Sequence, residues 1–354
     1  MLECILKFGE NKMNRNMIEA NCDFFTNICN SLDEDLAEQV PSCKRYISTN
    51  PEDKNWLKHL EVKYTHRFSK NSYAMMLMLG DEDYLCFVNV NIFKQNPPPI
   101  LQEIAVNPGL ATVLGAIGYL TPKVDRTKQE YLFNNVLYET PEEYSGHLWQ
   151  DIEQNFPPIL CYQIDLSGYD VEIRNNINCF YWVVCQAALE FDIGNNPFTS
   201  TSKDAWEKAI YEGSLDSLEY RNILLAYTAL SWDISYLYLY QCLEDMFASE
   251  SVRSLYKKLS LDITALDLSR ILYDELSWQP KDIEGIEKIL ATHDDSSKAK
   301  TLLNSVANGQ KLERFIYSLR NRTVHETRET LISLDDATTW NAVIAGMLYL
   351  LLGK

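Results

Sequence analysis

The second half of the chain limits the possible folds most strongly, because it carries helical patterns almost without interruption. From Lys203 onwards, apolar residues recur at spacings of three and four, and the strand-like patterns of the first half fade. The stretch from Tyr236 to Tyr240 alternates like a strand, but it lies in an apolar run far too long for one. Such helices bury their apolar sides against one another, so we expect an all-α helix bundle. The predicted helices are residues 204–211, 217–249 (with one possible break), 252–259, 263–276, 282–292, 296–306, 311–326 and 335–352.

The first half mixes helical patterns with strand-like ones. Residues 72–79 and 84–93 are two apolar runs that flank Gly80-Asp81-Glu82-Asp83, a sequence typical of a hairpin turn. Residues 130–138 and 159–166 have the same strand-like character. We therefore predict an α+β fold, in which a domain with a mostly antiparallel sheet precedes the helix bundle.

A polar segment at residues 194–202, GNNPFTSTS, separates the two patterns. It contains Pro197, and Ser202 stands where it could cap the following helix. A chain of 354 residues is also longer than one ordinary hydrophobic core. We therefore predict two domains, an α+β domain at residues 1–195 and an all-α domain at residues 196–354.

The composition argues against several classes of function. A net charge of −18 is unsuited to a general nucleic-acid binder, although a nuclease needs only a local basic patch. One candidate patch lies near the C-terminus, where an ordinary mixed-charge helix face is the alternative interpretation. It comprises Lys311, Arg314, Arg320, Arg322 and Arg328 against Glu313, Glu326 and Glu329.

The cysteines and histidines do not indicate a metal site. The 9 cysteines are scattered without a Cys-x-x-Cys pair, so they are typical of buried thiols in a reducing compartment. The 5 histidines are dispersed, and glycine-rich phosphate loops are absent from the sequence. Neither a signal peptide nor a membrane-spanning run is recognisable. We expect a cytoplasmic protein with no cofactor, no metal and no membrane association.

The stretch from Lys311 to Glu326, KLERFIYSLRNRTVHE, is the main candidate for chemistry. It predicts an amphipathic helix whose apolar stripe contains Leu312, Phe315, Ile316 and Leu319. The helix ends with an arginine, an asparagine directly after it, and a histidine four residues further on. These residues are Arg320, Asn321 and His325.

This arrangement resembles the signature of the HEPN superfamily (higher eukaryotes and prokaryotes nucleotide-binding domains). That signature is an arginine, four to six residues, then a histidine, usually with Asn, Asp or His directly after the arginine. The resemblance covers the motif and the helical pattern of roughly the last 150 residues. It implies a dimeric helix bundle that cleaves RNA without a metal, with Arg320, Asn321 and His325 as catalytic residues.

The resemblance also implies partners and a biological setting. Two motifs would meet across a two-fold axis in a homodimer with a composite active site, and RNA would be the substrate. Related domain arrangements occur in anti-phage defence of the abortive-infection type and in toxins. The N-terminal domain would then bind an antitoxin, a phage component or another regulatory partner.

Other interpretations of the same residues remain open. Arg320 and His325 are also typical of solvated cations that favour a helix C-terminus. The domain is then a non-catalytic nucleotide-binding, RNA-binding or dimerisation module, or the target of a nucleotidyltransferase or antitoxin. The tyrosines Tyr236, Tyr238 and Tyr240 stack bases or, more simply, belong to the core. Glu244 pairs with Arg320 or another motif residue, or faces solvent beside Asp245.

Overall fold

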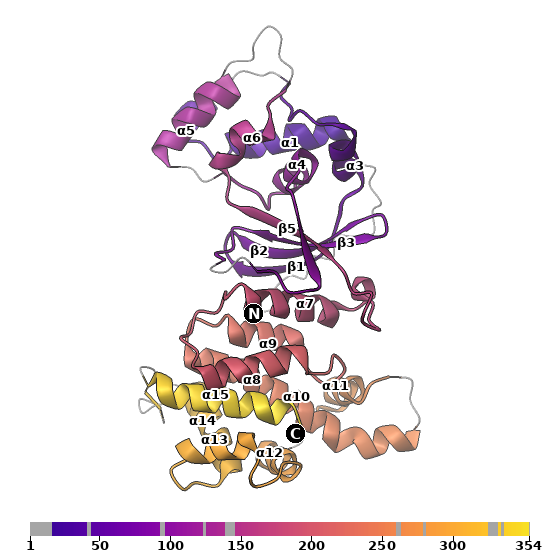
Figure 1. Ribbon diagram of the computed structural model, residues 1–354, viewed down its shortest axis with the longest axis vertical. Coiled ribbons are helices and arrows are strands. Elements are labelled where there is room, and N and C mark those ends of the chain that lie inside the picture. The colour runs from indigo at the N-terminus through magenta and orange to yellow at the C-terminus, as the bar shows by residue number, and fades with distance from the viewer. Residues whose placement is uncertain are drawn as a thin grey trace. The chain divides into compact units, whose positions relative to one another are not determined.

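In the computed structural model, the chain forms two compact units (Figure 1). The first unit comprises Met1–Asn91 and Pro99–Asp170, and the second comprises Ile92–Pro98 and Val171–Lys354. The structure describes residues 16–40, 44–92, 96–122, 125–138, 146–259, 263–278, 281–324, 332–333 and 336–353, apart from the side chains of residues 254 and 266.

The first unit is built on a five-stranded antiparallel sheet in the order β1-β2-β3-β5-β4. The strands are β1 (Glu61–Ser69), β2 (Ser72–Leu79), β3 (Glu82–Val88), β4 (Leu101–Ile104) and β5 (Ile159–Ile164). The predicted hairpin is confirmed, because Leu79 pairs with Glu82 across a two-residue turn. Gly80 has a φ of 63° in that turn, a conformation that glycine adopts without strain.

Helices cover one face of this sheet and form the core with it (Figure 1). They include α1 (Met17–Cys29), α3 (Pro51–His59) and α4 (Pro108–Ala116), with the short α2 (Glu34–Ala37) after α1. Alternate residues of the strands point towards the helices, and Met75, Leu77 and Cys86 among them are fully buried. The core contains Phe24, Leu57 and Leu114 from the helices and Met75, Leu77 and Cys86 from the sheet.

The strand prediction at residues 130–138 was wrong. This segment is the end of α5 (Arg126–Leu132) followed by a π-helical turn, Phe133–Tyr138. The Asp125 side chain caps α5 by accepting a hydrogen bond from the Lys128 N–H at 2.9 Å. A short apolar run is compatible with either a helix or a strand. Here the N-cap residue just before the run was the local signal for a helix. The remaining short helices of this region are α6 (Trp149–Ile152) and a 3₁₀ turn at Glu153–Asn155.

The described part of the second unit is helical, as predicted. α15 lies at its centre, since most residues of α15 are buried and it packs against α8, α10 and α13. The predicted break in the long helix is confirmed between α9 and α10. The helices are α7 (Ile177–Glu190), α8 (Ser200–Tyr211), α9 (Tyr220–Tyr227), α10 (Trp232–Leu259), α11 (Ala265–Leu276), α12 (Asp282–Ala291), α13 (Lys298–Val306), α14 (Leu312–Val324) and α15 (Ala337–Leu351).

The division between the two units differs from the predicted boundary at residue 195, because α7 belongs with the helices that follow it. The Trp182 indole donates a hydrogen bond to the Ile210 carbonyl at 2.9 Å. The Asn178 amide donates to the carbonyls of Leu215 and Leu218, at 2.8 and 2.7 Å. These bonds tie α7 to α8 and to the segment between α8 and α9. The cap of α8 is Thr199 rather than the expected Ser202.

None of the described helices combines the length and the apolar character that crossing a membrane requires.

Candidate active site

The helix that carries the motif packs as its sequence predicts. Leu312, Phe315, Ile316 and Leu319 of α14 are all buried. Arg314 and Arg322 lie on the exposed side, and Arg320 and Asn321 are half-buried. The apolar stripe therefore fixes the rotation of α14 and brings Arg320 to the edge of the buried face.

Arg320 and Asn321 interact with each other. The Arg320 Nη1 donates a hydrogen bond to the Asn321 Oδ1 at 3.1 Å. The guanidinium carbon also lies 5.8 Å from the centre of the Tyr240 ring, within range of a cation–π contact. The arginine is thus held between the asparagine amide and an aromatic ring of α10. His325, the third predicted residue, lies outside the described residues, as does Arg328 of the candidate basic patch.

One face of α10 supports the motif helix. Tyr236, Tyr240 and Glu244 follow one another at four-residue intervals, so they share a face. The Tyr236 hydroxyl donates to the Ile316 carbonyl of α14 at 2.6 Å, inside the core. Tyr236 and Tyr240 are 0% and 2% exposed, which confirms their interpretation as core aromatics rather than base-stacking ones. Tyr238 is half-buried.

Glu244 is the acidic residue of this face of α10. Its carboxyl group is half-buried rather than solvent-facing, and this burial is the main reason that its pKa rises to about 7. The nearby negative charge of Asp282 raises this pKa further, and the positive charge of Arg320 opposes the rise. Glu244 is therefore within electrostatic reach of the motif arginine and changes its charge near neutral pH.

Asp282, the first residue of α12, completes the group. Its carboxylate lies close enough to Tyr240 and Glu244 to raise the pKa of both, after the larger effect of burial. Asp282 does not stand out in the sequence, because an acidic residue at the start of a helix is common and has a local explanation. Only the packing of α10 against both α12 and α14 brings it to the site.

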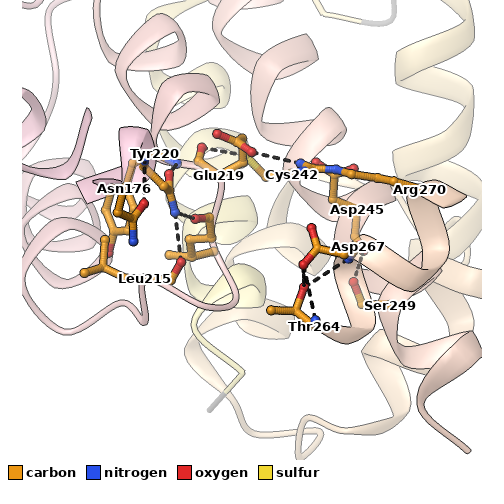
Figure 2. Close-up of polar contacts among 12 residues, drawn as sticks. Asn176, Leu215, Glu219, Tyr220, Cys242, Asp245, Ser249, Thr264, Asp267 and Arg270 are labelled. Carbon is orange, nitrogen blue, oxygen red and sulfur yellow. Dashed lines mark hydrogen bonds and ion pairs between the residues drawn. The ribbon is translucent and has the colours of Figure 1, made fainter. Parts of the chain in front are cut away.

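A second polar cluster lies elsewhere on α10 and is a connection between helices. Arg270 of α11 forms an ion pair with Glu219 at 2.9 Å, and Figure 2 shows its side chain reaching across Asp245 towards Glu219. Burial raises the pKa of Asp245 to about 6, Glu219 adds to the rise, and Arg270 opposes it. Asp267 and Thr264 form a capping box at the start of α11. This cluster joins the N-terminus of α9 to α10 and α11.

The residues around Arg320 are suited to phosphate binding and to proton transfer. A guanidinium binds phosphate through paired donors, and an acid that titrates near pH 7 is suited to accept or donate a proton. The part of the chain that the structure describes contains no group of three His, Cys, Asp or Glu side chains that could hold a metal ion.

Comparisons of the chain with protein-family models, curated proteins and solved structures found no match.

Proposed function

We propose that this protein is a metal-independent endoribonuclease of the HEPN type. The single observation that carries the proposal is the pairing of Arg320 with Asn321 at the end of α14, beside Tyr240 and Glu244. Because Asn321 and Tyr240 contact the Arg320 side chain, the pairing supports a role for Arg320 as a cation that is held in position before any phosphate binds. His325 follows four residues after Asn321 in the sequence.

The proposed reaction is transesterification within the RNA. The 2′-oxygen of a ribose attacks the adjacent phosphorus, loses its proton to a base, and displaces the 5′-oxygen, which gains a proton from an acid. His325 serves as base or acid, because histidine titrates near neutrality. Arg320 binds the phosphate and stabilises the charge that develops on it. The products are a 2′,3′-cyclic phosphate and a 5′-hydroxyl.

Glu244 contributes to this site in one of two ways that follow from its charge. When it is protonated, Arg320 is free of a competing carboxylate and binds phosphate more strongly. When it is ionised, it holds the arginine by electrostatic attraction but repels the phosphate. The motif contains one histidine, so the proposal includes a homodimer in which two motifs form a composite site across a two-fold axis.

The proposed setting is the cytoplasm of a prokaryotic cell, in anti-phage defence or as a toxin. The first unit then binds the regulatory partner, such as an antitoxin or a phage component.

The test is cleavage of RNA by purified full-length protein in the presence of EDTA. We expect cleavage with cyclic phosphate ends, and at least about a 100-fold loss of rate in Arg320→Ala and His325→Ala. Arg253→Ala is the control, because Arg253 is an exposed arginine of α10 that lies outside the candidate basic patch, and this variant should retain full activity.

Two results would overturn the proposal in different ways. Undiminished cleavage by His325→Ala would reject the assigned site. Tight RNA binding by the wild-type protein with no turnover would instead favour the non-catalytic binding module. Circular dichroism and thermal unfolding of each variant separate a loss of chemistry from a loss of fold.

A further inference from the structure

Two thiols face each other across the middle of the sheet in the first unit. Cys86 of β3 is paired with Cys161 of β5, and the two strands are antiparallel. Both residues belong to the core between the sheet and its helices, with exposed fractions of 0% and 1%. They lie 75 positions apart in sequence, so only the strand pairing brings them together.

The register of the strands places the two cysteines at the closest kind of cross-strand position. The Asn89 N–H donates to the Pro158 carbonyl at 3.0 Å, which marks residues 89 and 158 as a hydrogen-bonded pair. Hydrogen-bonded and non-hydrogen-bonded pairs alternate along an antiparallel ladder. Three steps along, Cys86 and Cys161 form a non-hydrogen-bonded pair, whose Cα atoms are typically about 4.5 Å apart. A disulfide accepts Cα separations of roughly 4.4 to 6.8 Å.

The two thiols are near enough to influence each other. A hydrogen bond with the Cys161 thiol is the main reason that the pKa of Cys86 lies well above its usual value, and burial adds to it. Both cysteines are free thiols in this structure. Because the register sets the two cysteines directly opposite each other with both side chains in the same core, a disulfide can form through a change in the side-chain torsions, without a shift of the strands.

We propose that Cys86 and Cys161 are an oxidisable dithiol, which forms a cross-strand disulfide when the protein meets a small-molecule disulfide. One cysteine, as its thiolate, attacks the small disulfide and releases one small thiol. The second cysteine then attacks the mixed disulfide and releases the other. In balance, two cysteine thiols are oxidised to one disulfide, and one small disulfide is reduced to two thiols.

Burial determines how fast this exchange occurs. Because the thiolate is the reactive form, a buried thiol with a raised pKa reacts only when the sheet opens locally. β4, four residues long, is the outermost strand beside β5 and pairs Ile104 with Cys161. Separation of this short strand exposes the backbone next to Cys161. The dithiol therefore stays reduced on brief exposure and is oxidised on sustained exposure.

The consequence is a covalent link between two strands of the sheet. The disulfide closes the chain between residues 86 and 161 into a loop, which restricts the unfolded state and raises the unfolding midpoint of the first unit. The proposal concerns the first unit alone and does not depend on the proposed nuclease site.

The test is incubation of the full chain with oxidised glutathione, followed by trypsin digestion without reduction. Cleavage after lysine and arginine releases Cys86 in the peptide 71–94 and Cys161 in the peptide 129–174, each with a single cysteine. We expect these two peptides to appear linked, and the unfolding midpoint to rise by about 5 °C and to return on reduction.

Cysteine variants test whether the linked peptide and the shift in the unfolding midpoint come from this pair rather than from other thiols. Cys86→Ala and Cys161→Ala should each abolish the linked peptide and the shift. Cys179→Ala, which removes a buried thiol of α7, should change neither. Cys22 is exposed and reports that the oxidant is active, because it should acquire glutathione in every sample.

Hydrogen exchange in the same buffer shows when β5 has opened. The proposal is overturned if the amides of β5 exchange completely while Cys86 and Cys161 both remain thiols.

Discussion

The backbone N–H of Thr199 donates a hydrogen bond at 2.8 Å to the side-chain oxygen of Asn341, 142 positions further along the chain. The side-chain amide nitrogen of Asn341 donates to the carbonyls of Pro197 and Ala337, at 3.3 and 2.7 Å. The side-chain oxygen of Asn341 also accepts from the Ser202 hydroxyl. Asn341 is 3% exposed. One buried side chain of α15 therefore fixes the segment that leads into α8.

We expect Asn341→Leu to lower the free energy of unfolding by about 2–3 kcal/mol, because it leaves buried backbone groups without partners. Chemical denaturation measures the loss. Asn304→Leu is the control, since Asn304 is exposed on α13 and its replacement should change stability by less than about 0.5 kcal/mol. Equal effects of the two variants would contradict the role of Asn341.

Tyr236→Phe tests the connection between α10 and α14. The variant removes the hydroxyl that donates to the Ile316 carbonyl in a fully buried position. We expect a loss of about 1–2 kcal/mol in urea unfolding, because the carbonyl keeps only its bond within the helix. Tyr273→Phe removes a hydroxyl from a side chain that is 52% exposed and should leave the midpoint unchanged.

Glu244→Gln tests the acid beside Arg320 through the pH dependence of stability. The pKa of Glu244 in the folded protein is about 7, above the usual 4.5, so the folded state favours its protonated form. The stability that this preference contributes is complete below about pH 4.5 and is lost as the pH rises through about 7.

The glutamine variant should therefore match the wild type near pH 4.5 and exceed it by about 1–3 kcal/mol at pH 8. Unfolding midpoints across this range measure the difference. Glu207→Gln, at an exposed position of α8, should follow the wild type at every pH. A constant offset between Glu244→Gln and the wild type would contradict the raised pKa.

Arg270→Met tests the cluster drawn in Figure 2. Without the guanidinium, Glu219 and Asp245 lose the positive charge that offsets their repulsion, so the pKa of Asp245 should rise above its present value of about 6. Protonation of Asp245 stabilises the fold, and that contribution is lost as the pH rises through the folded pKa.

We expect the methionine variant to lose about 1 kcal/mol at pH 7.5, a modest value because the Arg270 side chain is 48% exposed, and less at pH 5. Denaturation at both pH values measures this change. Lys281→Met breaks an ion pair whose partners are 82% and 62% exposed, and should cost less than about 0.5 kcal/mol. A loss that grows at pH 5 would be the opposite of the expected sign.

Gly109→Ala tests the packing of α4 against α3 in the first unit. A methyl group at this position would lie 2.0 Å from the Asp53 carbonyl oxygen, a backbone atom that cannot move aside cheaply. We expect a loss of about 2–3 kcal/mol, measured by thermal unfolding. Gly168→Ala, which meets nothing within 4 Å, is the matched control and should retain the wild-type midpoint.

The sequence alone determined those features that depend on neighbouring residues. The stripe of Leu312, Phe315, Ile316 and Leu319 predicted the buried face of α14, and the residues around Gly80 predicted the hairpin. Helical periodicity and turn chemistry are local, so they can be recognised without knowledge of the fold. The motif of Arg320, Asn321 and His325 was also selected from sequence, and its catalytic role stays a prediction.

Only the tertiary structure decided which distant residues meet. It brought Glu244 and Asp282 to the neighbourhood of Arg320, and it set Cys86 opposite Cys161. It also made residues 130–138 helical, where an apolar run suited either structure. The reason is that these features depend on contacts between segments far apart in sequence. Burial by such contacts raises the pKa of Glu244, and strand register aligns the two thiols. No local pattern in the sequence encodes those contacts.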